Sequence, residues 1–429
     1  MLSRDQLIVV LDAPELGPTR PVGVLTRWPG TRPAISFEYA GSWLRDKAPF
    51  PLDPRLPLLD GDIYLRESRI PPSLNDTSPD AWGELLLTRR AGRHLSAWDL
   101  LVAVSDETRM GALRLCRSLG GPFINDGEPA VPPTAELHAL QAAARAVEAD
   151  PDAPMTDPNI AILVAPGSSL GGARPKANFR DVDGSLWIAK FPSRGDRQDV
   201  GAWEHVYANL ARAAGVKVSD TDLLSIGGRA RTFITRRFDR TSEGDRRLFA
   251  SAMTLADMDD GDPAGYADVA RAINLHVAPD MVRDDLAQLF RRLLFNVVAG
   301  NRDDHLRNHG FLRAPDGWRL APAFDMNPAR EAREHSLSLD GRTIAPDIVA
   351  ALATHRLYGL SEAEALVVLR EVTDVATGWR TEATRAGIPA AEQGIVGVAF
   401  AALDPALALL SARARGIAAR PPRPPSLNA

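Results

Sequence analysis

The stretch Asn301-Arg302-Asp303-Asp304-His305-Leu306-Arg307-Asn308 brings carboxylates, amides and a histidine together in one short segment. It follows a strongly apolar run, residues 286–298, and Gly300 closes that run. An apolar run of this length predicts a buried helix, and a glycine just past it predicts where that helix ends. The polar stretch is therefore expected to form a loop held in place by the core.

A second polar loop follows closely, in residues 320–328 (Leu-Ala-Pro-Ala-Phe-Asp-Met-Asn-Pro). Asp303 and Asn308 are five positions apart, the spacing of a kinase loop in which Asp is the base and Asn binds Mg²⁺. Asp325 is the candidate main metal ligand, because carboxylate and amide oxygens suit Mg²⁺. These two loops predict a phosphate-transfer site.

A glycine-rich segment upstream is the candidate phosphate cradle. Gly171 and Gly172, beside Ser168, Ser169 and Ala173, would let backbone N–H groups approach an anion. The segment matches neither the P-loop pattern nor the kinase GxGxxG loop. Taken alone, it is equally compatible with an ordinary flexible turn.

Lys190 is the candidate cation for those phosphates. Strands over 177–182 and 185–191, joined by Asp183-Gly184, predict a hairpin that ends in this lysine. Glu204 lies 14 positions later, on a helix that Asp199 is expected to cap. A strand lysine paired with a helix glutamate is a kinase arrangement. The alternative is a lysine with its head in solvent and an unrelated surface glutamate.

Other interpretations of the 301–309 region remain open. Asp303, Asp304, His305 and His309 would suit a two-metal hydrolase, although HExxH is absent and few other histidines lie nearby. Asp303 and Asp304 would also suit a solvated loop or a helix cap. His305 would then serve as a structural histidine that orients its neighbours.

Composition limits the broad class. The chain has 429 residues, 45% of them apolar and 24% charged, with a net charge of −5. This length predicts two or three domains, and the net charge argues against a broad basic surface for nucleic acid. Cys116 has no partner cysteine, which fits a reducing compartment. We find no signal peptide and no apolar run of about 20 residues, so a cytoplasmic, non-membrane protein is expected.

The chain divides by pattern into four parts. Alternating residues predict strands over 5–12, 21–27 and 33–40, and helical patterns follow them. From residue 264 onward the pattern is helical, with an Ala- and Leu-rich helix over 395–418. The expected parts are an N-terminal α+β subdomain (1–120), a small lobe (134–240), a helical large lobe (241–419) and a disordered tail (420–429).

Several of these motifs together resemble the HipA family, the serine/threonine kinase toxins of bacterial type II toxin–antitoxin modules. The resemblance extends over roughly residues 20–380, and it implies a two-lobed α+β fold of the protein-kinase kind. The segments that carry it are 37–44, 169–176, 188–192, 237–240, 301–308 and 320–326.

The resemblance also implies roles for individual residues, with ATP and Mg²⁺ as cofactors. It assigns Asp303 as the base, with Lys190 and His305 in the catalytic set, and Asn308 and Asp325 as metal ligands. The implied nucleotide contacts are Ser169, Gly171, Gly172, Ala173, Lys190, Glu204, Arg236, Phe238, Asp239 and His305. Within that set, Arg236 and Phe238 form the adenine hinge, and Asp239 lies near the ribose.

Regulation and partners are implied in the same way. Ser169, or its neighbour Ser168, would be autophosphorylated and thereby silence the kinase, because its charge would repel ATP phosphates. The implied partners are a small helix-turn-helix antitoxin, which alone contacts DNA, and an aminoacyl-tRNA synthetase as substrate.

The chain departs from the family pattern at Arg236, at Arg307 and in residues 249–254, and these differences leave the substrate open. The alternative function is a binding module that holds its antitoxin and represses its operon without turnover.

Overall fold

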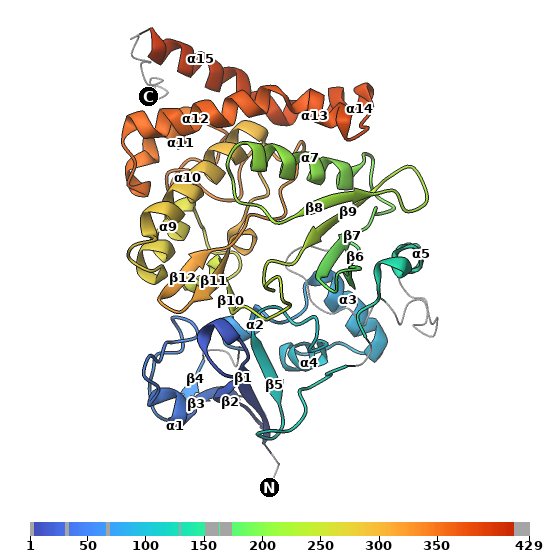
Figure 1. Ribbon diagram of the computed structural model, residues 1–429, viewed down its shortest axis with the longest axis vertical. Coiled ribbons are helices and arrows are strands. Elements are labelled where there is room, and N and C mark those ends of the chain that lie inside the picture. The colour runs from blue at the N-terminus through green and yellow to red at the C-terminus, as the bar shows by residue number, and fades with distance from the viewer. Residues whose placement is uncertain are drawn as a thin grey trace, which may run out of the picture.

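The structure is a computed structural model, and it describes residues 4–30, 34–65, 69–127, 130–150, 163 and 174–415. In these ranges the strands form three antiparallel sheets, and each sheet carries its own helices (Figure 1). The N-terminal sheet lies at the bottom of the view, the second sheet at the right, and the helical C-terminal half at the top.

The N-terminal sheet has the strand order β4-β3-β2-β1-β5. All three predicted strands are present here, and side chains that alternate along β3, such as Phe37 and Tyr39, are buried. The strands are β1 (Asp5–Leu11), β2 (Arg20–Trp28), β3 (Ala34–Tyr39), β4 (Ile63–Tyr64) and β5 (Leu113–Cys116). The helices are η1 (Pro14–Leu16), α1 (Gly41–Leu44), α2 (Pro72–Asn75), α3 (Ala81–Ala91) and α4 (Ala97–Ala103).

The second sheet has the order β6-β7-β9-β8, and its first two strands form the predicted hairpin at Asp183-Gly184. The predicted cap is also confirmed, because the Asp199 carboxylate accepts a hydrogen bond from the Ala202 N–H at the start of α7. The strands are β6 (Lys176–Arg180), β7 (Leu186–Lys190), β8 (Thr221–Leu224) and β9 (Thr232–Arg236). The helices are η3 (Thr134–Glu136), α5 (Leu137–Ala149) and α7 (Val200–Ala213).

The C-terminal half is built around α10 (Val282–Ala299), whose apolar face is buried as predicted. Gly300 ends the helix with φ +72°, and a Cβ there would lie 2.0 Å from the Ala399 carbonyl, so only glycine fits. The sheet is β10 (Phe249–Ser251), β11 (Gly310–Ala314) and β12 (Gly317–Leu320). The other helices are α8 (Ala252–Leu255), α9 (Tyr266–His276), η4 (Leu306–Asn308), α11 (Ile348–Ala353), η5 (Thr354–Tyr358), α12 (Glu362–Thr377), α13 (Trp379–Arg385), α14 (Ala390–Val396), η6 (Gly397–Ala402) and α15 (Leu403–Ala414).

The helix expected over 395–418 is confirmed as far as Ala414, with a kink at Phe400, whose ring stacks on Trp379 with centroids 4.6 Å apart. The stretch Ala390–Ala414 is also long and apolar enough to span a membrane by length and composition, contrary to the expectation of no such run. In the structure, α15, which forms the last part of this stretch, packs against α12 (Figure 1). The expected disordered tail, 420–429, lies outside the described residues.

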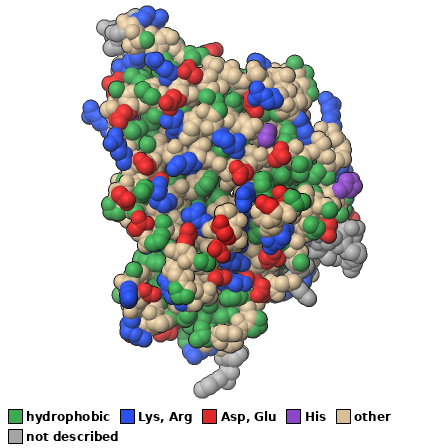
Figure 2. Space-filling model, viewed as in Figure 1, with side chains coloured by type: hydrophobic (Ala, Val, Ile, Leu, Met, Phe, Trp, Pro, Cys, Tyr) green, Lys and Arg blue, Asp and Glu red, His purple; other side chains and the backbone are tan. Residues whose placement is uncertain are grey.

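The N-terminal part contacts the second sheet through polar and apolar groups. Lys176 of β6 forms an ion pair of 2.7 Å with Asp80, and Trp82 donates a hydrogen bond to the Lys176 carbonyl. Figure 2 shows acidic and basic side chains interspersed over one face of the molecule. The boundaries predicted for the domains are not tested by these contacts and stay predictions.

Candidate functional site

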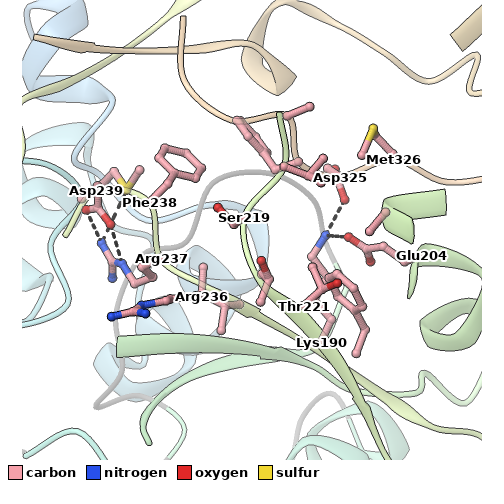
Figure 3. A pocket seen from close by; sticks show the side chains of 18 residues that line it. Lys190, Glu204, Ser219, Thr221, Arg236, Arg237, Phe238, Asp239, Asp325 and Met326 are labelled. Carbon is pink, nitrogen blue, oxygen red and sulfur yellow. Dashed lines mark hydrogen bonds and ion pairs between the residues drawn. The ribbon is translucent and has the colours of Figure 1, made fainter. Parts of the chain in front are cut away.

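A cavity of about 680 Å³, open to solvent, lies where the second sheet faces the C-terminal half. Most of its lining is apolar, and the charged groups lie at its two ends, with Ser219 and Thr221 between them (Figure 3). The lining residues are Met110, Ile188, Lys190, Glu204, Ala208, Val218, Ser219, Thr221, Phe233, Thr235, Arg236, Arg237, Phe238, Asp239, Ala323, Phe324, Asp325 and Met326.

One end of the cavity holds a buried ionic triad. The Lys190 ammonium lies 2.5 Å from Glu204 Oε1 and 2.6 Å from Asp325 Oδ1 (Figure 3). The lysine ends β7, the glutamate comes from α7, and the aspartate follows β12, so three separate elements meet here. The predicted pairing of Lys190 with Glu204 is thus present, with Asp325 added to it.

Within the triad, the charged forms of Lys190 and Asp325 are favoured despite burial. Burial acts to lower the pKa of Lys190, but Asp325 and Glu204 outweigh it and raise that pKa above its ordinary value. Burial acts to raise the pKa of Asp325, yet the Lys190 charge lowers it below the ordinary carboxyl value. Burial also raises the pKa of Glu204. Asp325 has φ +57°, a left-handed conformation that is uncommon for a residue other than glycine. Such backbone is typical of functional sites.

The other end of the cavity is the segment just after β9. Phe238 is half-buried and faces Phe324 with ring centroids 5.3 Å apart, which gives the cavity flat apolar walls. Asp239 also lines the cavity, but its carboxylate is fully buried and accepts hydrogen bonds from Arg237, Arg240 and the Gly111 N–H. Asp239 therefore anchors the hinge, and its expected ribose contact stays a prediction.

The 301–308 loop lies beside this cavity. Asp303 is exposed on the loop and lines a separate hollow of about 1190 Å³ next to Pro328 and the 195–198 segment. Partial desolvation, together with the Asp325 and Asp304 charges, raises the pKa of Asp303 above its ordinary value, and His305 opposes this. The Asn327 N–H donates a hydrogen bond to Asn301 Oδ1 at 3.4 Å, so this loop lies beside the loop that carries Asp325.

Asp304 is buried under the loop and has a different environment from Asp303. Its Oδ2 accepts hydrogen bonds from Tyr266 Oη (2.5 Å), Asn296 Nδ2 (2.9 Å) and His309 Nε2 (2.9 Å). Burial acts to raise the pKa of Asp304, but His309 and Tyr266 outweigh it and the pKa is lowered. Asp304 and His309 therefore fix the loop from below.

Asn308 has one free buried atom that fits a metal ligand. Its Nδ2 donates to the Asp303 carbonyl at 3.2 Å, whereas its Oδ1 is buried with no hydrogen-bond partner among the described residues. Such an oxygen suits a hard cation that keeps several waters or phosphate oxygens as ligands. In the part of the chain that the structure describes, no group of three His, Cys, Asp or Glu residues forms a metal site, so the two-metal alternative gains no support.

Sequence reasoning missed several groups of the site. Asn301 links the two loops, because its Oδ1 accepts from the Asn327 N–H at 3.4 Å and its Nδ2 donates to Asn296. Met110 reaches the cavity from the N-terminal part of the chain. Ser219 and Thr221 line it from a segment without periodic pattern. The glycine-rich residues Ser168, Ser169, Gly171, Gly172 and Ala173 lie outside the described residues.

Comparisons with known proteins agree with this architecture. HipA of Shewanella oneidensis MR-1, solved in complex with HipB and operator DNA, matches with a TM-score of 0.67 at 19% identity, over 96% of this chain and 100% of that chain. The likeness confirms the predicted two-lobed α+β fold of the protein-kinase kind.

Two curated relatives come from Sinorhizobium fredii. "Putative kinase Y4dM" is 26% identical over 60% of this chain and 62% of its own length. "Putative kinase Y4mE" is 24% identical over 68% of this chain and 71% of its own length. The chain thus spans less than two thirds of Y4dM. Residues 17–116 match the HipA N-terminal domain and residues 168–379 match the HipA-like C-terminal domain. With both domains present in order on a matching fold, the chain belongs to the HipA family.

Proposed function

We propose that this protein is an ATP- and Mg²⁺-dependent serine/threonine protein kinase that acts as the toxin of a toxin–antitoxin module. The observation that carries the proposal is Lys190 held between Glu204 and Asp325 at one end of a largely apolar cavity. A kinase needs this cation for the phosphates of ATP and this carboxylate for magnesium. The flat apolar walls at the Phe238 end suit an adenine ring.

The proposed reaction transfers the γ-phosphoryl group of ATP to a hydroxyl. The acceptor oxygen forms a bond to the γ-phosphorus while the bond to the bridging oxygen breaks, and ADP leaves. Asp303 orients the acceptor and takes its proton, and its raised pKa makes it a better base than an ordinary aspartate. Lys190 neutralises phosphate charge. Magnesium, when bound by Asn308 and Asp325, would supply further charge neutralisation.

The partners follow from the family. The Shewanella relative was solved with HipB and operator DNA. We propose that a small helix-turn-helix antitoxin binds this chain too, and that DNA is contacted through that partner. An aminoacyl-tRNA synthetase in the cytoplasm is the proposed substrate, and Ser169 (or Ser168) the proposed site of autophosphorylation. His305 is proposed to orient the loop.

One experiment tests the function. The wild type and Asp303→Ala are expressed without a partner, and growth and incorporation of label from γ-³²P-ATP are measured. We expect growth arrest and labelled protein with the wild type only. Glu331→Ala is the control, because Glu331 is exposed on the rim of the hollow that Asp303 lines. We expect this variant to keep both growth arrest and labelling. Equal toxicity and equal labelling of wild type and Asp303→Ala would leave the binding-module alternative.

A further inference from the structure

A second pocket, of about 510 Å³, borders the nucleotide cavity and shares Arg236 and Arg237 with it. Its floor and walls come from the β6–β7 hairpin and from the segment after β9. Five of its lining residues are arginines, and one is acidic, Glu107. The arginines are Arg180, Arg236, Arg237, Arg240 and Arg246.

The carboxylates behind the pocket are each shared between two arginines. Asp239 is 2.7 Å from Arg237 and 2.6 Å from Arg240. Asp106 likewise pairs with Arg246 and with Arg114 outside the pocket. Both carboxylates are at least 99% buried, so solvent does little to screen these charges. Arg114 has a further partner in Asp12 at 2.9 Å, so Asp106 can balance Arg246. Asp239 can balance only one of Arg237 and Arg240, which leaves one positive charge on the pocket wall.

Two more arginines lie at the mouth of the pocket, where they are more exposed to solvent and carboxylates neutralise their charges less completely. Arg180 is 42% exposed and pairs with Glu107. Arg236 is 29% exposed, and its nearest carboxylate is the exposed Asp220, 4.0 Å away. Burial, reinforced by its arginine neighbours and opposed by Asp239, lowers the pKa of Arg240 to about 9. Excess buried positive charge of this kind would be relieved by a bound anion.

We propose that the pocket formed by Arg180, Arg236, Arg240 and Arg246 binds a phosphate dianion, free or as the monoester of a small molecule. The terminal N–H groups of Arg240 and Arg246 already donate to protein oxygens, so these two residues would contribute mainly their charge. Arg236, whose ion pair with Asp220 is 4.0 Å long, would supply the donors, since planar guanidinium groups match phosphate oxygens in a bidentate manner. Because Arg236 and Arg237 border both cavities, the occupant would contact the back of the hinge. The proposal does not depend on kinase activity.

Calorimetric titration of the full chain with inorganic phosphate and with O-phosphoserine tests the site. We expect saturable binding at one site. Tighter binding of O-phosphoserine would identify a monoester as the ligand, and equal or weaker binding would identify free phosphate. Absence of saturable binding would overturn the proposal.

Variants locate the site. Arg180→Gln removes one guanidinium at the mouth and should weaken phosphate binding about tenfold. Arg283→Gln makes the same charge change at a 72%-exposed position elsewhere and should leave binding unchanged. Should Arg180→Gln fail to fold, Thr241→Glu places a carboxylate in the pocket and should abolish binding while raising the melting temperature. Equal weakening by Arg180→Gln and Arg283→Gln, or unchanged binding in Thr241→Glu, would overturn the assignment.

Discussion

Lys190 Nζ donates a hydrogen bond of 2.6 Å to Asp325 Oδ1. The cation proposed to contact ATP phosphates is thus paired with the carboxylate proposed to bind magnesium. Glu204 holds the same ammonium from the other side at 2.5 Å. The two carboxylates would repel each other without the lysine between them. The triad therefore ties the stability of the fold to the geometry of the site.

Lys190→Met should lower the free energy of unfolding by about 3–5 kcal/mol, because it leaves the buried Glu204 carboxylate and the partly buried Asp325 carboxylate without their cation. Adding Glu204→Gln should recover part of that loss, since one of the two uncompensated charges is then gone. Urea denaturation measures both effects. Lys217→Met, at an exposed lysine, is the control and should change stability by less than about 0.5 kcal/mol. Equal losses in the single and double variants would contradict this account of the triad.

Asp303 and Asp304 are neighbours with opposite expected roles. Asp303→Asn should cut the rate of phosphate transfer about 10²- to 10⁴-fold with little change in stability, because the side chain is exposed. Asp304→Asn should lower the free energy of unfolding by about 2–4 kcal/mol, because a carboxylate that accepts three hydrogen bonds is replaced by an amide. Labelling assays and urea denaturation on both variants check the division. A large loss of stability in Asp303→Asn would refute it.

Asn308→Leu should raise the magnesium concentration needed for half-maximal activity about tenfold or more, because the free Oδ1 is lost. Titration of activity with Mg²⁺ at saturating ATP measures this shift. Asn274→Leu, on α9 and away from the loop, is the matched control and should leave the requirement unchanged. An unchanged requirement in Asn308→Leu would remove Asn308 from the proposed metal site.

The parts of the site that the sequence predicted lie in short motifs on regular elements. The pairing of Lys190 with Glu204 was predictable, because a hairpin signal and a capped helix fix where each side chain begins. The addition of Asp325 to that pair was not, because it depends on how the loop after β12 crosses to the second sheet. Its φ of +57° has no sequence signature in an aspartate.

The position of Asp239 could be predicted from the sequence, but its hydrogen-bond partners could not. Its motif placed it near the hinge, and it does line the cavity. No sequence pattern indicated that Gly111, 128 positions away, donates a backbone hydrogen bond to it. Long-range partners of a buried charge follow from domain packing, which local patterns do not encode. The kink at Phe400 is similar, since its stacking on Trp379 is a tertiary contact.

Asp76 should make stability fall as pH rises. Burial raises its pKa to about 6, although the Ser251 N–H and the Thr254 hydroxyl, which donate to it, oppose the shift. The folded state then binds a proton more tightly than the unfolded state, whose carboxyl has the ordinary pKa of 3.8. Stability is therefore lost between about pH 4 and pH 6, and the total is about 3 kcal/mol.

Asp76→Asn removes this titration and should be more stable than the wild type at pH 8, with a smaller difference at pH 4. Thermal or urea unfolding at the two pH values measures the change. Asp316→Asn, at an exposed turn, is the control and should show no such pH dependence. A difference between Asp76→Asn and wild type that is the same at both pH values would rule out ionisation of Asp76 as the cause.

Asp239→Ala should destabilise the contact between the N-terminal part and the hinge. It leaves Arg237 and Arg240 buried without their carboxylate and the Gly111 N–H without its acceptor, a loss of about 3–5 kcal/mol. Because Gly111 precedes β5, we expect the N-terminal sheet to become sensitive to protease before the rest of the chain. Limited proteolysis with mass spectrometry checks this, with the exposed Asp245→Ala as control. Uniform cleavage along the chain would mean that Asp239 stabilises the whole fold and not this contact.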